Sequence, residues 1–185
     1  TSEFDIYADQ YEANKHYFLA HYFKDHYNHA LANLPFINSP INITKIEVWV
    51  TNKTGTTVDT RNIVSFLDLG ETGPSQDPET GGFIPTNIYN EQFTNDNGGS
   101  YPDNNAANDM FESLTTAFSG IRDINEVNSV LSSVIGMNFL NGQDYEKLER
   151  ARKLGESEYT IHSQLGYLSL NQALNNDEVL AVAFQ

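Results

Sequence analysis

The chain of 185 residues has no cysteine. This absence excludes disulfides, thiolate catalysis and zinc sites built from cysteine. It does not fix the compartment, because an oxidising compartment permits disulfides without requiring them. The sequence also lacks any apolar run near the roughly 18–20 residues that a membrane-spanning helix needs, and it does not open with a basic and then apolar signal segment. We therefore expect this segment to be soluble and not to span the membrane.

Positive charge is also scarce, with ten Lys and Arg against 25 Asp and Glu and a net charge of −15. Such a balance opposes binding to nucleic acid or anionic lipid and favours a solvated acidic surface. The apolar fraction of 39% is modest, but 12% of the residues are aromatic, and each buried ring removes a large area from water. The length suits one domain, which we place at residues 1–185.

The first part of the chain predicts a long helix from about Asp9 to Asn33. Apolar residues recur there at three- and four-residue spacing, which is typical of an amphipathic helix. Pro35 should end it, because proline disfavours the helical conformation in the residue before it. The stripe comprises Leu19, Phe23, Tyr27, Ala30 and Leu34.

Alternation of apolar and polar residues predicts a strand over 46–50, with Ile46, Val48 and Val50 on its buried face. The opposite parity of the preceding isoleucines predicts a bulge or break near Lys45. A second strand, over 62–69, is apolar on both sides, and we expect it to be central in the sheet.

The last part predicts three shorter helices and two or three strands. The helices are indicated by apolar spacing over 111–121, by a D-x-x-E capping pattern at Asp123 and Glu126, and by i,i+4 charge pairs over 144–154. Strands follow at 158–162, 166–170 and 179–185, and the last stops in mid-pattern, which suggests a piece of a longer polypeptide. The expected fold is therefore α+β: an antiparallel sheet of about five strands packed with a long N-terminal helix and three shorter helices.

Between these parts lies an acidic excursion, residues 70–108. With Asp109 at its far end it carries seven acids, and it has no Lys or Arg. Loops longer than about 12–15 residues are usually functional or disordered. Its apolar islands predict that it lies against a surface, either of its own domain or of a partner. The candidates for contact with a partner or a cargo protein are Phe83, Ile88, Tyr89, Phe93 and Tyr101.

Catalytic signatures are missing: no P-loop, G-x-G-x-x-G, G-x-S-x-G or H-E-x-x-H occurs, and no spacing singles out one pair among the 25 acids. We therefore predict neither an enzyme nor a cofactor. A candidate metal set is His21, Asp25 and His29, which recur at i, i+4 and i+8 of the predicted helix. Surface histidines are the commoner explanation, because nothing identifies further ligands or a second shell.

Calcium is a second metal candidate, at residues 95–98 with the sequence NDNG. An EF-hand loop needs acids or amides at alternate positions before its glycine. Phe93 stands where the first ligand would be, so the motif fails as an EF-hand, and a looser calcium site stays open.

Several ordered stretches carry a family resemblance. They are YFLAHYF (17–23), NITKIEVWVTNK (42–53), GQDYEKLE (142–149), QLGYLSLN (164–171) and DEVLAVAFQ (177–185). Together they resemble the SprA family (called Sov in some members), the outer-membrane translocons of type IX secretion and gliding motility. The resemblance covers nearly the whole chain except the acidic excursion.

The resemblance implies a very large outer-membrane β-barrel interrupted by soluble insertions. This segment is similar to the inserted SprA amino-terminal-type domain, which would face the periplasm or the cell exterior. The implied role is a non-catalytic domain that shapes or gates the channel, with the parent barrel, a small barrel subunit and secreted cargo as protein partners. The family offers no catalytic residues to carry over.

An alternative from a different class is a surface module that binds carbohydrate or protein. Trp49, Tyr89 and Tyr101 would then serve as stacking platforms beside Asn-rich loops. The exposure of Trp49 decides this alternative, because Trp49 lies opposite the predicted buried face of its strand.

Overall fold

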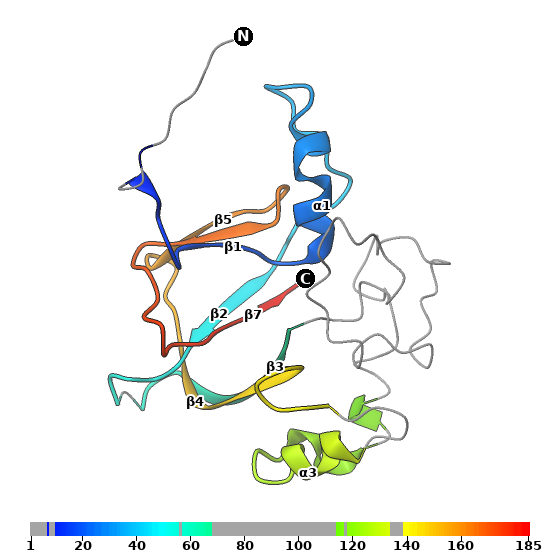
Figure 1. The fold of residues 1–185 in the computed structure, drawn as a ribbon, viewed down its shortest axis with the longest axis vertical. Coiled ribbons are helices and arrows are strands. Elements are labelled where there is room, and N and C mark those ends of the chain that lie inside the picture. Colours follow the sequence, from blue (N-terminus) through cyan, green and yellow to red (C-terminus); the bar gives the residue numbers. More distant parts are fainter. Residues whose placement is uncertain (1–6, 8–9, 56, 68–113, 117, 134–138) are drawn as a thin grey trace.

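In the computed structural model, the described residues are 7, 10–55, 57–67, 114–116, 118–133 and 139–185. They form a mainly β fold with two antiparallel sheets, shown in Figure 1. The three-stranded sheet has the order β1-β6-β5, from strands β1 (His16–Phe18), β5 (Tyr159–His162) and β6 (Tyr167–Leu170). The four-stranded sheet has the order β3-β4-β2-β7, from strands β2 (Ile46–Val50), β3 (Thr60–Phe66), β4 (Tyr145–Lys153) and β7 (Leu180–Phe184).

The two sheets pack through the even-numbered face of β2. Val48 and Val50 contact Leu168 and Leu170 of β6 in one buried cluster. Val48 is paired with Val182 on β7, and paired residues of neighbouring strands point to the same side of a sheet. The alternating apolar residues that predicted β2 from the sequence are therefore the residues that pack between the two sheets.

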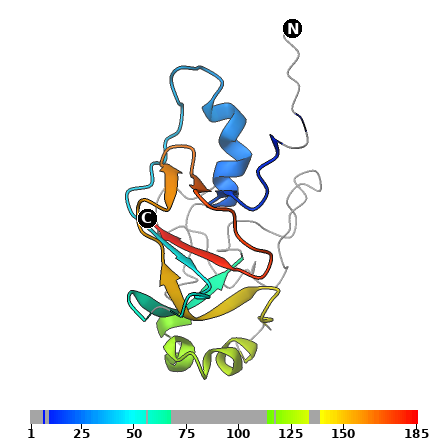
Figure 2. The same cartoon turned by 90° about the vertical axis from the view of Figure 1, so that its left-hand side faces the viewer.

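The other end of the four-stranded sheet is covered by short helices, the 3₁₀-helix η2 (Ser119–Arg122) and α3 (Val127–Ser132). Figure 2 shows α3 against the β3–β4 end. The cluster beneath them contains Leu114, Leu131 and Tyr145, with Phe66 packed against it. Because Phe66 pairs with Tyr145, β3 and β4 present this side of the sheet to the helices.

The predicted helix over 9–33 is wrong in its extent. Helix α1 covers only His21–Ala30, and His16–Phe18 forms strand β1. Aromatic residues suit half-buried strand positions, and here Tyr17 packs into the cluster between the sheets while its neighbours point outward. The apolar residues of a strand and of a helix follow one another in this part of the sequence. Tyr17 packs in the cluster between the sheets, whereas Tyr22 and Phe23 pack in another cluster, so the spacing resembled one long helical stripe.

The helix predicted over 144–154 is also wrong, because these residues form β4. Tyr145, Leu148 and Ala151 are buried at a spacing of three, which resembles a helix. The strand produces this spacing because both of its faces are buried and a register shift interrupts its pairing with β3. Arg150, at the shift, has a positive φ of 53°.

The expected single sheet of about five strands is wrong as well. The predicted strand over 62–69 corresponds to β3, but β3 lies at the edge of its sheet, and β4 separates it from β2. Its apolar residues face two ways because Val64 and Phe66 pack toward the helices while Ile63 joins the Trp49 cluster. The last three predicted strands are confirmed, and so is the break near Lys45, where the strand begins at Ile46.

Candidate functional site

The odd-numbered face of the four-stranded sheet lines an open groove of about 1890 Å³. Strands β2, β3 and β7 form its floor, and helix α1 and the loop over 174–178 contribute to its rim. Pockets for drug-sized ligands occupy roughly 300–1,000 Å³. A groove of this size fits a polypeptide segment better than a small molecule.

Trp49 lies in the floor of this groove and is 4% exposed. It packs against Leu148 and Ala181. The Arg61 guanidinium carbon and the Lys153 Nζ lie 5.5 and 5.6 Å from its ring centroid, within cation–π range. Trp49 is therefore a packing residue, and the prediction that it serves as an exposed stacking platform is wrong.

The charges in the groove are unequal. Lys24, Arg61 and Arg122 line it, and in the described part of the chain no acid forms an ion pair with these three cations. Glu47 also lines the groove, but its Oε1 lies 2.6 Å from the Nζ of Lys153. That hydrogen bond holds the pKa of Glu47 below its ordinary value of 4.5.

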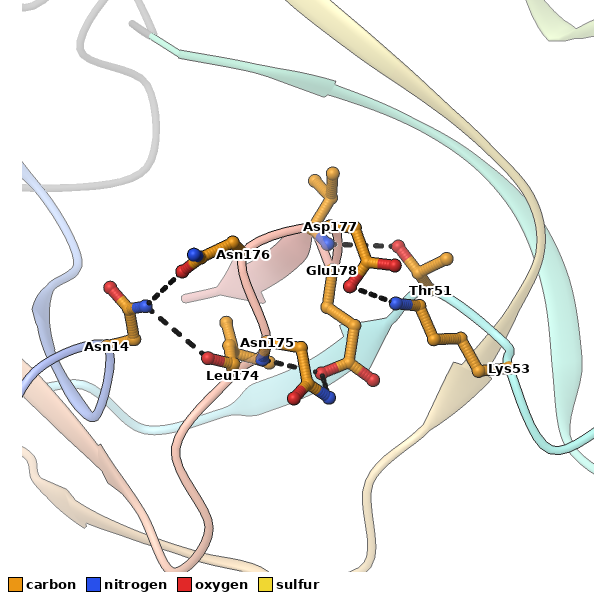
Figure 3. Close-up of polar contacts among 9 residues, drawn as sticks. Asn14, Thr51, Lys53, Leu174, Asn175, Asn176, Asp177 and Glu178 are labelled. Atoms are coloured by element: carbon orange, nitrogen blue, oxygen red, sulfur yellow. Dashed lines mark hydrogen bonds and ion pairs between the residues drawn. The ribbon is translucent and has the colours of Figure 1, made fainter.

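A polar junction, shown in Figure 3, joins the loop over 174–178, which lines the groove, to other parts of the chain. Asn14, ahead of β1, donates from Nδ2 to the Leu174 carbonyl (3.4 Å) and to Asn176 Oδ1 (3.2 Å). Glu178 Oε2 accepts from the backbone N–H and the side-chain amide of Asn175, both at 2.8 Å. These bonds fix the loop 174–178 between the two sheets.

The same junction is fastened to the end of β2. The Val179 N–H donates to Thr51 Oγ1 at 2.9 Å, and Lys53 forms an ion pair with Asp177. The hydrogen bond from Lys53 lowers the pKa of Asp177 from its ordinary value of 3.8. The loop on the rim of the groove is therefore held by bonds to two other parts of the chain, Asn14 and the end of β2.

The outer face of the three-stranded sheet carries a contact with the connectivity of a catalytic triad. The His16 Nδ1 lies 2.7 Å from Ser169 Oγ, and the His16 Nε2 lies 2.8 Å from Glu12 Oε2. The side chains of His16 and Glu12 are 47% and 51% exposed, whereas catalytic hydrogen bonds gain strength where water is excluded. Ser169 also sits in the central strand, paired on both sides. We interpret the arrangement as a cross-strand contact.

Beside this contact lies an aromatic cluster that the sequence did not indicate. Phe18, Tyr27 and Tyr167 meet edge to face, with centroids 5.4–6.5 Å apart, and His162 stacks on Tyr167 at 5.5 Å. Its members come from β1, α1, β5 and β6. Only the pairing of Phe18 and His162 with Tyr167 across the sheet brings them together, and no local sequence pattern encodes that pairing.

The metal candidate stays a prediction. The backbone of α1 places His21, Asp25 and His29 at i, i+4 and i+8. The side chains of His21 and Asp25 lie outside the described residues, and so does the calcium candidate at 95–98. Elsewhere in the described part of the chain, no group of three or more His, Asp or Glu side chains could hold a metal ion.

The predicted contact residues of the acidic excursion lie outside the described residues. They are Phe83, Ile88, Tyr89, Phe93 and Tyr101. The structure does describe the residues that flank the excursion. Phe66 and Leu114 pack in the same apolar cluster, and both line the groove.

The described residues thus define a mainly β domain with a broad groove on one sheet face. A scan against models of known protein families and a search of curated proteins both returned no match for this chain. Over the ranges that the structure describes, no helix is long and apolar enough to cross a membrane.

Proposed function

We propose that this chain is a non-catalytic domain of an outer-membrane protein-secretion channel of the SprA type, and that it shapes or gates the channel through protein contacts. The resemblance of the stretches at 17–23, 42–53 and 142–149 supports this proposal. In the fold these stretches supply most of β1, the first three residues of α1, all of β2 and the first half of β4. They therefore contribute to both sheets of the described core.

The observation that carries the proposal is the packing of the described residues that flank the acidic excursion. Phe66 precedes it and Leu114 follows it, and both pack with the buried Tyr145 in one apolar cluster. A packed cluster moves little, so the domain holds Phe66 and Leu114, the described residues that flank the acidic, aromatic-containing segment, at a fixed place. This arrangement suits a domain that presents the segment to a neighbouring domain, a partner subunit or passing cargo.

The proposal is tested by replacing residues 70–108 with a Gly-Ser linker of equal length in the full-length parent protein. We expect secretion of cargo to fall while the amount of parent protein in the outer membrane stays constant. The matched control replaces the exposed turn over residues 32–36 in the same way. Normal secretion with the linker in place of the excursion would refute the gating role and leave only the scaffold role.

A second function, binding of carbohydrate, is favoured by one observation. Phe18 is 43% exposed at the edge of the aromatic cluster with Tyr27 and Tyr167. Aromatic faces beside polar side chains suit an amphipathic ligand such as a sugar, and His16 and Ser169 lie on the same sheet face. This cluster replaces Trp49 as the platform of that alternative.

Carbohydrate binding is tested by titrating cell-wall glycan fragments into the protein and following its NMR signals. Shifts confined to Phe18, Tyr167 and their neighbours, and lost in Phe18→Ala, would favour this second function. No saturable shift at this face would exclude it.

A further inference from the structure

Strand β7 is an outer strand of the four-stranded sheet, and its only neighbour among the described strands is β2. Gln185 and Lys45 exchange two backbone hydrogen bonds, and the Thr51 N–H donates to the Val179 carbonyl. In an antiparallel pair, such bonded positions alternate with positions whose N–H and C=O point away from the neighbouring strand. The positions of β7 that point away from β2 are therefore Leu180, Val182 and Phe184.

Strand β7 lacks the features that usually prevent an outer strand from pairing with another chain. Natural edge strands are short, carry charges or proline, or are bent by a bulge. The outer strands β1 and β5 have only three and four residues, and β3 has a register shift beside Arg61. Strand β7 pairs with β2 in continuous register over five residues, and no charge or proline occurs over 179–185. Its edge is therefore suited to the addition of a strand.

The groove over the odd-numbered face of the sheet extends to the edge of β7. Every residue over 180–185 lines it. The side chains of a strand alternate between two faces, so a groove that touches consecutive residues also runs along the edge of that strand. Residues 61–67 line the groove in the same way, and they include most of β3, the opposite outer strand of the sheet. The groove therefore lies between the two outer strands of one curved sheet.

The approach of these two strands distinguishes between the possible occupants. Cα atoms of β3 and β7 come within 8 Å of each other. A second copy would have to bring its own β7, with β2 behind it, into this space, and its net charge of −15 would repel the first copy. A single extended segment needs only the width of one strand, about 4.7–4.9 Å from its neighbour. The groove therefore fits one strand of a partner better than the sheet of a second copy.

We propose that β7 binds a single extended strand of a partner protein, which adds to the edge of the four-stranded sheet. Backbone hydrogen bonds to Leu180, Val182 and Phe184 supply the affinity, as in other cases of strand addition. The side chains of Leu180 and Val182 pack in the apolar cluster between the sheets, so the added strand is apolar at alternate positions. The uncharged edge favours uncharged residues between them. This contact does not depend on the proposed role of the acidic excursion in secretion.

A synthetic peptide with the sequence of residues 179–185, VLAVAFQ, is a suitable probe, because it is uncharged and apolar at alternate positions. Paired antiparallel with β7, it places its leucine opposite Phe184 and its phenylalanine opposite Leu180. Amide hydrogen exchange of the full chain is measured by NMR with and without this peptide. A strand of this length buries less area than a standard interface, so we expect a dissociation constant on the order of 0.1 mM.

The outward amides of β7 report strand addition directly. With the peptide at roughly ten times the dissociation constant, exchange at Leu180, Val182 and Phe184 should slow about tenfold. The amides of Ala181 and Ala183, which face β2, should change much less. The same peptide with Val182→Pro should leave all five amides unchanged, because proline has no N–H and disfavours a strand.

Variants of the protein locate the binding edge. Ala183→Lys places a charge at an exposed position of β7 and should weaken peptide binding severalfold. Thr160→Lys makes the same change of charge at an exposed position of β5, an outer strand of the other sheet, and should leave peptide binding unchanged. Circular dichroism and the urea midpoint check that both variants keep the fold.

The same measurements give the results that would overturn the proposal. Slow exchange of the outward amides without peptide would mean that another segment of the same chain already pairs with β7. Exchange that slows as the protein concentration rises, again without peptide, would mean that a second copy occupies the edge. No effect of the peptide at millimolar concentration, or an equal effect of its Val182→Pro form, would mean that strand addition at β7 does not occur.

Discussion

Gly166 should tolerate alanine poorly, because two separate features of the structure oppose a side chain there. Its φ is +60°, and a Cβ would lie 2.0 Å from Cγ of Phe23. A left-handed conformation costs an L-residue roughly 1–2 kcal/mol. An overpacked site costs about 1–3 kcal/mol more. Alanine also restricts the unfolded chain, which returns about 0.4–1 kcal/mol.

We therefore expect Gly166→Ala to lower the free energy of unfolding by about 2–4 kcal/mol. Gly55 provides the matched control, since its φ is +67° and a Cβ at this position would have no neighbouring atom within 4 Å. Gly55→Ala should cost only about 1 kcal/mol, the backbone part alone. The difference between the two variants measures the contact with Phe23.

The assay is urea unfolding followed by the fluorescence of Trp49, the single tryptophan, which is buried in the folded state. A double-mutant cycle with Phe23→Ala, which removes the Cγ and both Cδ atoms that the new Cβ would meet, completes the experiment. The cost of Gly166→Ala should fall by at least about 1 kcal/mol when Phe23 is shortened. Equal costs for Gly166→Ala and Gly55→Ala would refute the packing of α1 on the β5–β6 turn.

Two further predictions concern stability. Asp144 is fully buried and its Oδ2 accepts the Leu140 N–H at 2.6 Å, so Asp144→Ala should cost about 1–3 kcal/mol in urea unfolding, and Asp144→Asn, which keeps an acceptor, should cost less. The pKa of Glu47 is lowered by Lys153, and that of Glu158 by the Gly155 N–H and then Arg152. Because unfolding returns both groups to about 4.5, the unfolded state binds more protons in acid, and stability should fall as the pH drops below about 4.5. Glu47→Gln with Glu158→Gln should make that fall shallower, and an unchanged slope would contradict the assignment.

The sequence predicts those elements whose burial follows a simple local pattern. Strand β2 alternates because only its even-numbered face meets the other sheet, and β7 repeats that pattern opposite it. The break near Lys45 was predictable because the preceding isoleucines stand on the opposite parity to Ile46, Val48 and Val50. In both strands the alternation along the sequence matches the alternation of residues that pack against the other sheet.

The prediction of secondary structure failed where one stretch of residues packs into two different apolar clusters. Strand β4 buries Tyr145 under α3 and Leu148 beside Trp49, so its apolar spacing follows neither the strand nor the helix period. Lys147 and Glu149 form an ion pair at i,i+2 along the strand, while the helical i,i+4 pairs do not form in the described contacts. The groove could not be predicted, because its lining residues come from α1, β2, β3, β7 and η2, which lie far apart in the sequence.

In the proposed function, the domain acts through protein contacts of its acidic excursion during secretion. Photo-crosslinking in secreting cells tests it, with the reactive group at Phe93 or Tyr101 of the full-length parent and a control at Val58, which is 70% exposed. We predict adducts from positions 93 and 101 with secreted cargo or with a fixed subunit, and none above background from position 58. Cargo adducts would place the excursion on the transport route, and adducts only with the barrel would make it an assembly contact. Equal labelling at all three positions would contradict the claim.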